Sequence, residues 1–142
     1  MAAGRCAGDL PLSIWPRPSA IRARSAKRPR DLILTYSAQH LSQEPLRADV
    51  DSQAGLTVLE FGTPWCPHCL GAQPLIEAAL GPRADIRHLK VEDGPGRPLG
   101  RSYRVKLWPT LVLLRDGQEV ARVVRPTDGA SMAAMLAASP TP

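Results

Sequence analysis

Apolar residues along this chain fall into short continuous runs that glycine and proline separate. Runs of this kind are typical of strands buried on both faces of a sheet. The predicted strands cover residues 56–62, 86–91 and 111–114. Asp116-Gly117 is a hairpin turn signal, and it predicts a further antiparallel strand over 119–124. Glu60 is the one charged side chain in the first run.

A second pattern has the spacing of a helix. The apolar residues after position 69 recur at helical intervals and precede a Gly81-Pro82 stop; they are Leu70, Ala72, Leu75, Ile76, Ala79 and Leu80. Shorter helices are expected at 99–105 and 131–138, with a turn at 94–96.

The segment before the first strand has a weaker pattern. Residues 32–36 are apolar and start or dock on the sheet, and 37–50 is expected to be an irregular helix interrupted by Pro45. The elements therefore alternate between strand and helix and end in a hairpin. That order predicts an α/β fold with a mixed sheet between helices.

Length and charge divide the chain into two parts. A chain of 142 residues that is 44% hydrophobic can form one ordinary core. Residues 1–31 hold seven basic and two acidic side chains, so the whole net charge of +5 lies there. We expect residues 1–30 to be a basic, disordered leader and residues 31–142 to form the folded domain.

The leader bears on location and partners. It lacks the small-residue cleavage site of a secretory signal, and no apolar stretch approaches the roughly 20 residues of a membrane-spanning helix. A cytoplasmic protein is expected, with organelle targeting or export as the alternative if the leader is a targeting segment. Its arginines are not interleaved with aromatic residues, so no specific nucleic-acid partner is expected.

The candidate chemistry lies in the run Trp65-Cys66-Pro67-His68-Cys69. A CxxC pair can be half of a zinc site, a redox pair or two inert core residues. The zinc interpretation lacks a second CxxC or an HxxxH, and no metal is expected. The third cysteine, Cys6, stands alone in the leader, so a structural disulfide framework is not indicated.

The redox interpretation follows from the strand–turn–helix context. In the first turn of the helix, unsatisfied backbone N–H groups would stabilise a Cys66 thiolate, the form that attacks a disulfide. Cys69, one turn later, would resolve the mixed disulfide. Pro67 suits the first helical position, which needs no N–H. His68 either lowers the pKa of Cys66 or is only an exposed polar residue.

The CxxC run, its preceding strand and the later Trp108-Pro109-Thr110 together resemble the thioredoxin family. The resemblance extends from about residue 32 to the C-terminus and implies the thioredoxin fold. It also implies that Pro109 is a cis-proline facing the cysteines, and that Trp108 and Trp65 help to bind substrate peptide. Trp108 is bulkier than the residue usual at its position.

The resemblance gives roles to two charged residues as well. Glu60 takes the place of the buried acid that moves the resolving cysteine's proton, and Lys90 takes the place of its companion lysine; the alternative is an ordinary ion pair between the two. A carboxyl group in an apolar strand is expected to have a raised pKa. Pro67-His68 between the cysteines differs from the Gly-Pro of thioredoxins and resembles bacterial disulfide oxidants of the Dsb type.

The sequence thus predicts a monomeric thiol–disulfide oxidoreductase that acts on protein or peptide disulfides. Its redox centre would be the Cys66/Cys69 pair, with no bound cofactor, and a thiol/disulfide partner such as a reductase would recycle it. Two alternatives stay open: a non-catalytic binding module of the same fold, and a metal-delivery protein that uses Cys66, Cys69 and His68.

Overall fold

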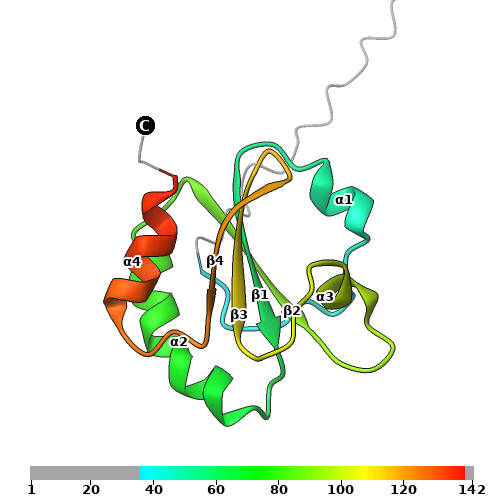
Figure 1. Cartoon of the computed structure of the whole chain (residues 1–142), viewed down its shortest axis with the longest axis horizontal. Coiled ribbons are helices and arrows are strands. Elements are labelled where there is room, and N and C mark those ends of the chain that lie inside the picture. The colour runs from blue at the N-terminus through cyan, green and yellow to red at the C-terminus, as the bar shows by residue number, and fades with distance from the viewer. Residues whose placement is uncertain (1–35, 140–142) are drawn as a thin grey trace, which may run out of the picture. The chain divides into compact units, whose positions relative to one another are not determined.

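A computed structural model describes residues 36–139 of the chain (Figure 1). The elements in chain order are α1 (Arg47–Asp51), β1 (Leu56–Gly62), α2 (Pro67–Leu80), β2 (Ile86–Glu92), α3 (Pro98–Ser102), β3 (Thr110–Arg115), β4 (Gln118–Val124) and α4 (Gly129–Ala137). The predicted leader and Cys6 lie outside the described residues, as does most of the apolar run at 32–36.

The strands form one mixed sheet with the order β2-β1-β3-β4. Strands β1 and β2 are parallel because α2 crosses between them, and β3 runs antiparallel to both β1 and β4. The predicted α/β thioredoxin fold is confirmed. Asp116 and Gly117 have φ values of 49° and 80°, as the tight β3–β4 hairpin requires.

Helices cover both faces of the sheet, so the core has two halves. Helices α2 and α4 pack on one face, where the buried residues include Val58, Ile76, Leu111 and Met132. Helices α1 and α3 lie on the other, where Leu59, Phe61, Leu99 and Tyr103 are buried. Successive residues of β1 therefore contribute to opposite faces, as period-two strand geometry dictates. Fully burying each large apolar side chain stabilises the fold by about 1.5–3 kcal/mol.

Three predicted helices have different bounds in the structure. The helix expected over 37–50 was wrong for most of its length, because only Arg47–Asp51 is helical. Pro45 has no N–H to donate and disfavours helical backbone in Glu44, so the helix begins after it. Helix α3 ends at Ser102 before Arg104 takes a positive φ of 57°. Helix α4 begins at Gly129, where the Asp128 side chain caps it by accepting the Ser131 N–H.

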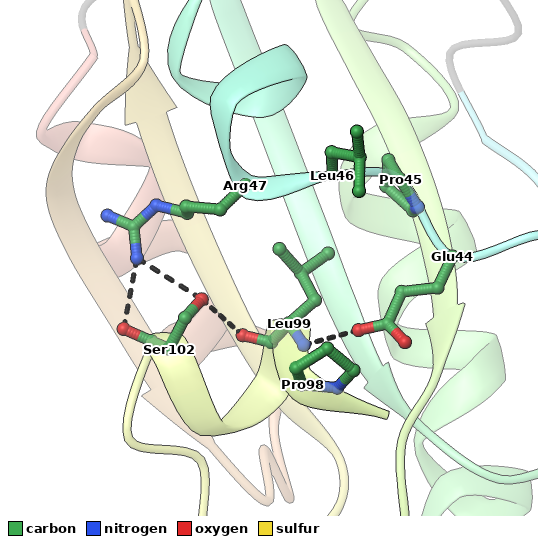
Figure 2. Close-up of a pocket in the computed structure, with 7 residues that line it drawn as sticks. All are labelled: Glu44, Pro45, Leu46, Arg47, Pro98, Leu99 and Ser102. Carbon is green, nitrogen blue, oxygen red and sulfur yellow. Dashed lines mark hydrogen bonds between the residues drawn. The ribbon is translucent and has the colours of Figure 1, made fainter. Parts of the chain in front are cut away.

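A hollow of about 310 Å³ lies where α1 meets α3 (Figure 2). The Glu44 carboxylate accepts the Leu99 N–H, and Arg47 Nη1 donates to the Ser102 carbonyl at 3.0 Å. These bonds join the loop before α1 to α3, on the face of the sheet opposite α2. The hollow is therefore separate from the cysteines. No helix within residues 36–139 is long and apolar enough to cross a membrane.

Candidate functional site

The two cysteines lie where β1 leads into α2. Cys66 is the N-cap residue of α2, and Pro67 occupies the first turn, where a missing N–H costs nothing. Cys69 follows within the first turn. Both are free thiols and both are nearly buried, with 6% and 3% of their surface exposed. The prediction placed Cys66 in the first turn, and the structure places it one residue earlier, at the cap.

Cys66 has a lowered pKa. Burial alone would raise it, but interactions with the backbone amide and thiol of Cys69, the backbone amide of His68 and the charge of Arg125 together outweigh burial. The Cys66 side chain makes no capping hydrogen bond to α2. The backbone amides at the start of α2 therefore stabilise its thiolate as the positive end of the helix dipole. His68 contributes here through its backbone, and its side chain is exposed.

The pKa of Cys69 is shifted in the opposite direction from that of Cys66. The pKa of its thiol is raised to about 11; burial is the largest cause and the neighbouring Cys66 and Glu60 also raise it, although the Thr63 backbone opposes the rise. Cys66 is thus the thiol that ionises first, and Cys69 keeps its proton. This asymmetry is what stepwise disulfide exchange needs, since the thiolate attacks and the partner thiol must wait.

Gly62, the last residue of β1, leaves room for the Cys69 sulfur. A Cβ at this position would lie 2.5 Å from Cys69 Sγ, far inside van der Waals contact. The close approach of strand and sulfur therefore requires glycine here. The sequence analysis did not identify this role.

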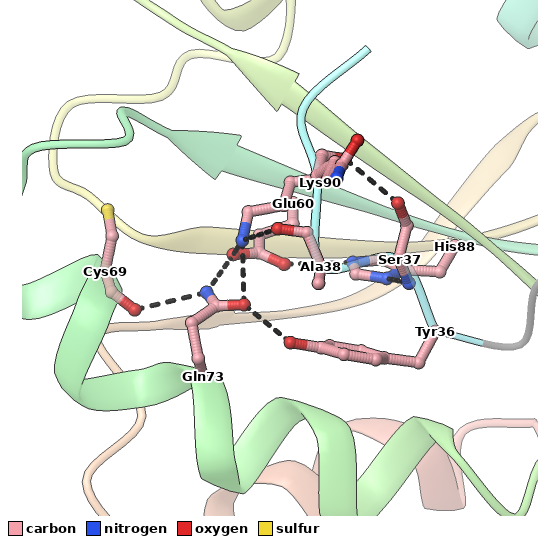
Figure 3. A network of polar contacts seen from close by, with 9 residues as sticks. Tyr36, Ser37, Ala38, Glu60, Cys69, Gln73, His88 and Lys90 are labelled. Atoms are coloured by element: carbon pink, nitrogen blue, oxygen red, sulfur yellow. Dashed lines mark hydrogen bonds and ion pairs between the residues drawn. The ribbon is translucent and has the colours of Figure 1, made fainter.

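Glu60, in the middle of β1, is held by three side chains (Figure 3). His88 Nε2 lies 2.9 Å from Glu60 Oε2, while Gln73 Nε2 donates to Oε1 at 2.6 Å. Lys90 Nζ lies 3.8 Å from the same Oε1. The parallel register places Lys90 beside Glu60, and His88 lies two residues earlier on the same face of β2.

The predicted rise in the pKa of Glu60 was wrong. Burial does act to raise it, but the hydrogen bond from His88, the charge of Lys90 and the hydrogen bond from Gln73 lower it below its ordinary value. Glu60 is therefore an ionised, paired carboxylate. No hydrogen bond within residues 36–139 joins it to the Cys69 thiol, and Gln73 links the two residues by also donating to the Cys69 carbonyl at 3.1 Å.

The sequence analysis missed His88 and Gln73. The Ser37 N–H donates to His88 Nδ1 at 2.8 Å, so Nδ1 is an acceptor and the ring proton lies on Nε2, facing Glu60. Gln73 Oε1 accepts from Lys90 Nζ at 2.8 Å and from Tyr36 Oη at 3.0 Å. The signal for His88 was its place two residues from Lys90 in a buried strand. Gln73 gave no signal, because it looks like an ordinary helical residue.

The cis-proline loop completes the site. The Trp108–Pro109 peptide bond is cis, as the resemblance implied. Trp108 Nε1 donates to Asp93 Oδ2 at 2.8 Å, and its ring meets that of Trp65 edge-on at 5.9 Å. Trp65 is 68% exposed. The two indoles thus form an apolar surface beside the cysteines, with only one of them fixed by a hydrogen bond.

The described residues include no group of three or more His, Cys, Asp or Glu side chains placed to hold a metal ion. His88 and Lys90 each pair with the Glu60 carboxylate instead.

The Thioredoxin family model matches residues 37–138, nearly the whole of the described domain. The chain belongs to the thioredoxin family. The Cys66–Cys69 spacing fits the CxxC motif of this family, and the match extends across the sheet and helices described above.

Individual thioredoxins agree with this assignment. The chain is 34% identical over 99 residues to a thioredoxin of Chlamydia trachomatis, covering 69% of this chain and 94% of the relative. It is 36% identical over 69 residues to thioredoxin H2-1 of Oryza sativa, and there it spans only 50% of the relative's length. The reduced form of thioredoxin 2 from Pseudomonas aeruginosa superposes with a TM-score of 0.65 and 50% identity, over 72% of this chain and 96% of that one.

These thioredoxin homologues and structures support the assignment of the chain as a thiol–disulfide oxidoreductase. Family membership in general implies protein disulfides as substrates and a reductase as partner.

Proposed function

We propose that this protein exchanges disulfides with protein or peptide substrates, with Cys66 as the attacking and Cys69 as the resolving thiol. The observation that carries the proposal is the asymmetry of the pair: the pKa of Cys66 is lowered and that of Cys69 is raised to about 11. Two inert core cysteines would have no reason to differ in this way. A purely binding module would not need the second thiol.

The proposed reaction has two steps. The Cys66 thiolate attacks one sulfur of the substrate disulfide, a mixed disulfide forms, and the other substrate sulfur leaves as a thiolate. Cys69 then loses its proton and attacks Cys66 Sγ, which releases the second substrate thiolate. The substrate gains two electrons and the Cys66/Cys69 pair becomes a disulfide, which a dithiol donor must reduce before the next turnover.

The first step itself prepares the second. The hydrogen bond to Cys66 and the negative charge of its thiolate both help to raise the pKa of Cys69. Both vanish when Cys66 enters the mixed disulfide, so Cys69 ionises more readily at the stage when it must attack. Glu60 and Lys90 act in this proposal on the charge around Cys69, as positioning residues rather than as groups that touch the reacting sulfurs.

The remaining expectations belong to the same proposal. Trp65, Trp108 and Pro109 form the surface against which substrate peptide lies, Pro67 and His68 set the properties of the thiolate through the start of α2, and the sulfurs are the redox centre without a bound cofactor. A cytoplasmic monomer that a reductase recycles would fit this chemistry.

Alkylation against pH tests the proposal directly. We expect Cys66 of the reduced protein to react with iodoacetamide at a pH below that at which free cysteine ionises, because a lowered pKa makes the thiolate available at lower pH. Cys69 should react only at a higher pH, because burial and the charge of Glu60 still raise its pKa after Cys66 has been alkylated. Equal alkylation profiles for the two thiols would contradict the proposed division of roles.

Two substitutions test the order of the steps. Cys66→Ser should abolish the reduction of insulin disulfides, while Cys69→Ser should accumulate a mixed disulfide between Cys66 and substrate, visible by mass spectrometry. Cys6→Ser, which changes the cysteine outside the described residues, is the matched control and should leave both results unchanged. Full turnover by the Cys66→Ser protein would overturn the mechanism.

A further inference from the structure

Arg125 follows the last residue of β4 and lies against the cis-proline loop. Val124 pairs with Thr110 in the sheet, so Arg125, the residue after β4, comes opposite Pro109. The Arg125 N–H donates to the Pro109 carbonyl at 2.8 Å. The Arg125 side chain then turns back and Nε donates to the Trp108 carbonyl at 3.0 Å. The first bond holds the Arg125 backbone, and the second holds the guanidinium beside the backbone where the resemblance puts substrate.

The backbone of Arg125 has a φ of 48°, in the left-handed region that favours glycine. The turn carries the chain to Pro126, which is buried. Glycine would make this turn without a side chain. The chain instead places an exposed arginine there, close enough for its charge to help lower the pKa of Cys66.

The guanidinium has no carboxylate partner within residues 36–139, although five other lysine or arginine side chains in that range have one; they are Arg47, Arg83, Lys90, Arg97 and Arg122. The nearest acid in sequence, Asp128, is already committed, since its Oδ1 accepts the Ser131 N–H at 2.8 Å and the Ser131 hydroxyl at 2.7 Å. With Nε bound to Trp108, both terminal nitrogens of Arg125 keep the planar fork that a carboxylate fits.

A groove of about 270 Å³ extends from this arginine along the start of α2. Pro67 and His68 form the wall next to Cys66, Leu75 lies farther along α2, and Arg125 and Thr127 form the opposite wall. No acidic residue lines the groove. A substrate chain that reaches Cys66 through it therefore meets an unpaired positive charge, a ring nitrogen and a hydroxyl, but no repelling carboxylate.

We propose that Arg125 is the charged end of a specificity subsite that favours disulfides whose cysteine is flanked by an aspartate or glutamate. The inference rests on the proposed exchange function and deepens it by naming a substrate class. A peptide carries few anionic groups besides such carboxylates, and a bidentate pair with Arg125 would align the substrate sulfur with Cys66. Basic flanking residues would be repelled for the same reason.

The test uses the full reduced chain and a set of disulfide-linked peptides. Within the set, each position up to two residues before or after the cysteine carries Glu, Gln or Lys in turn. The second-order rate constant of reduction is measured for each peptide at low ionic strength. Dividing by the rate for the Gln peptide, within each variant, cancels any general change in the nucleophilicity of Cys66.

Three variants complete the design. Arg125→Gln removes the charge and keeps a non-glycine residue in the same left-handed turn. Arg125→Glu reverses the charge. Arg115→Gln is the matched control, because Arg115 is also an exposed arginine and lies at the far end of β3, where that strand pairs with the start of β1.

We expect the unaltered protein to prefer Glu over Gln by up to about five-fold at one or more positions, the upper end of what a single surface ion pair contributes. The preference should shrink as salt is added. Arg125→Gln should remove it, Arg125→Glu should shift it toward Lys, and Arg115→Gln should retain it. An unaltered protein without the preference, or one whose preference survives Arg125→Gln, would overturn the subsite. Failure to reduce any peptide would instead overturn the exchange function itself.

Discussion

His88 and Glu60 form a buried hydrogen-bonded pair, with Nε2 and Oε2 2.9 Å apart and their side chains 0% and 1% exposed. The Ser37 N–H fixes the orientation of the imidazole ring from its other nitrogen. The stacked ring of Tyr36, 5.5 Å away, covers one side. The segment before α1 therefore determines that the protonated ring nitrogen of His88 faces the Glu60 carboxylate. The charge near Cys69 thus depends on residues that are far from Cys69 in sequence.

The pair predicts the effect of His88→Val. Without Nε2–H, Glu60 Oε2 loses its donor in a buried site, so the pKa of Glu60 should rise toward or above its ordinary value. The folded protein should lose about 1–3 kcal/mol, the cost of an unsatisfied buried acceptor. Carboxyl NMR titration and urea unfolding measure the two effects.

The pH dependence of this loss has a defined sign. Glu60 has a lowered pKa in the folded state, so its contribution to stability is present above the unfolded-state pKa and disappears as the pH falls through the folded-state value. His88→Val should remove part of that contribution. In a Glu60→Leu background, the same substitution should cost less, since no carboxylate is left unpaired. Additive costs in this double-mutant cycle would show that the pair is not coupled.

Glu60 should also act on Cys69 at a distance. Its negative charge is one of the causes that raise the pKa of the Cys69 thiol, so Glu60→Gln should lower that pKa relative to the same protein with Glu60 intact. The pH profile of Cys69 alkylation, measured in a Cys66→Ser background, reports the change. Glu77→Gln is the control, because Glu77 is an exposed acid of α2 that does not contribute to the Cys69 pKa. An unchanged or raised pKa in Glu60→Gln would contradict the electrostatic role.

The sequence predicted the elements that depend on local pattern. The strand at 56–62 was confirmed because its apolar run ends at a glycine and has no competing signal. The helix after the cysteines was confirmed from its spacing and its Gly81-Pro82 stop. Leu70 belongs to that spacing but is 59% exposed, because it faces away from the sheet. Hydrophobic periodicity locates a helix more reliably than it assigns each residue to the buried face.

The site was less predictable because long-range pairing decides its charges. The CxxC motif itself identified both cysteines. The pKa of Glu60 could not be deduced from its strand alone, because its three partners come from α2 and β2 and the parallel register aligns them. Arg125 gave no signal either. Its position beside Cys66 follows from the pairing of β4 with β3, which places the end of one strand against the cis-proline loop.

The contact between Gly62 and Cys69 predicts a local effect on the resolving thiol. Gly62→Ala would put a methyl group 2.5 Å from Cys69 Sγ, so the sulfur or the start of α2 must move. We expect a loss of about 1–3 kcal/mol in the reduced protein, the usual cost of overpacking, and slower release of the mixed disulfide. Gly129→Ala is the matched control, because nothing lies within 4 Å of a Cβ there. Equal stability of the two variants would show that the site accepts the methyl group.

The hydrogen bond between Asp93 and Trp108 predicts a last effect, on substrate binding. Asp93 Oδ2 accepts the indole N–H at 2.8 Å and thereby fixes the ring against which Trp65 packs. In Asp93→Ala the Trp108 ring should sample more rotamers, which a lower fluorescence anisotropy would report. If the two indoles form the peptide surface, KM for insulin should rise several-fold while kcat changes little, since the thiols are untouched. Trp108→Phe keeps an aromatic ring but removes the N–H donor, so it should reproduce the rise in KM. A rise in KM for Asp93→Ala without one for Trp108→Phe would mean that Asp93 acts through another contact.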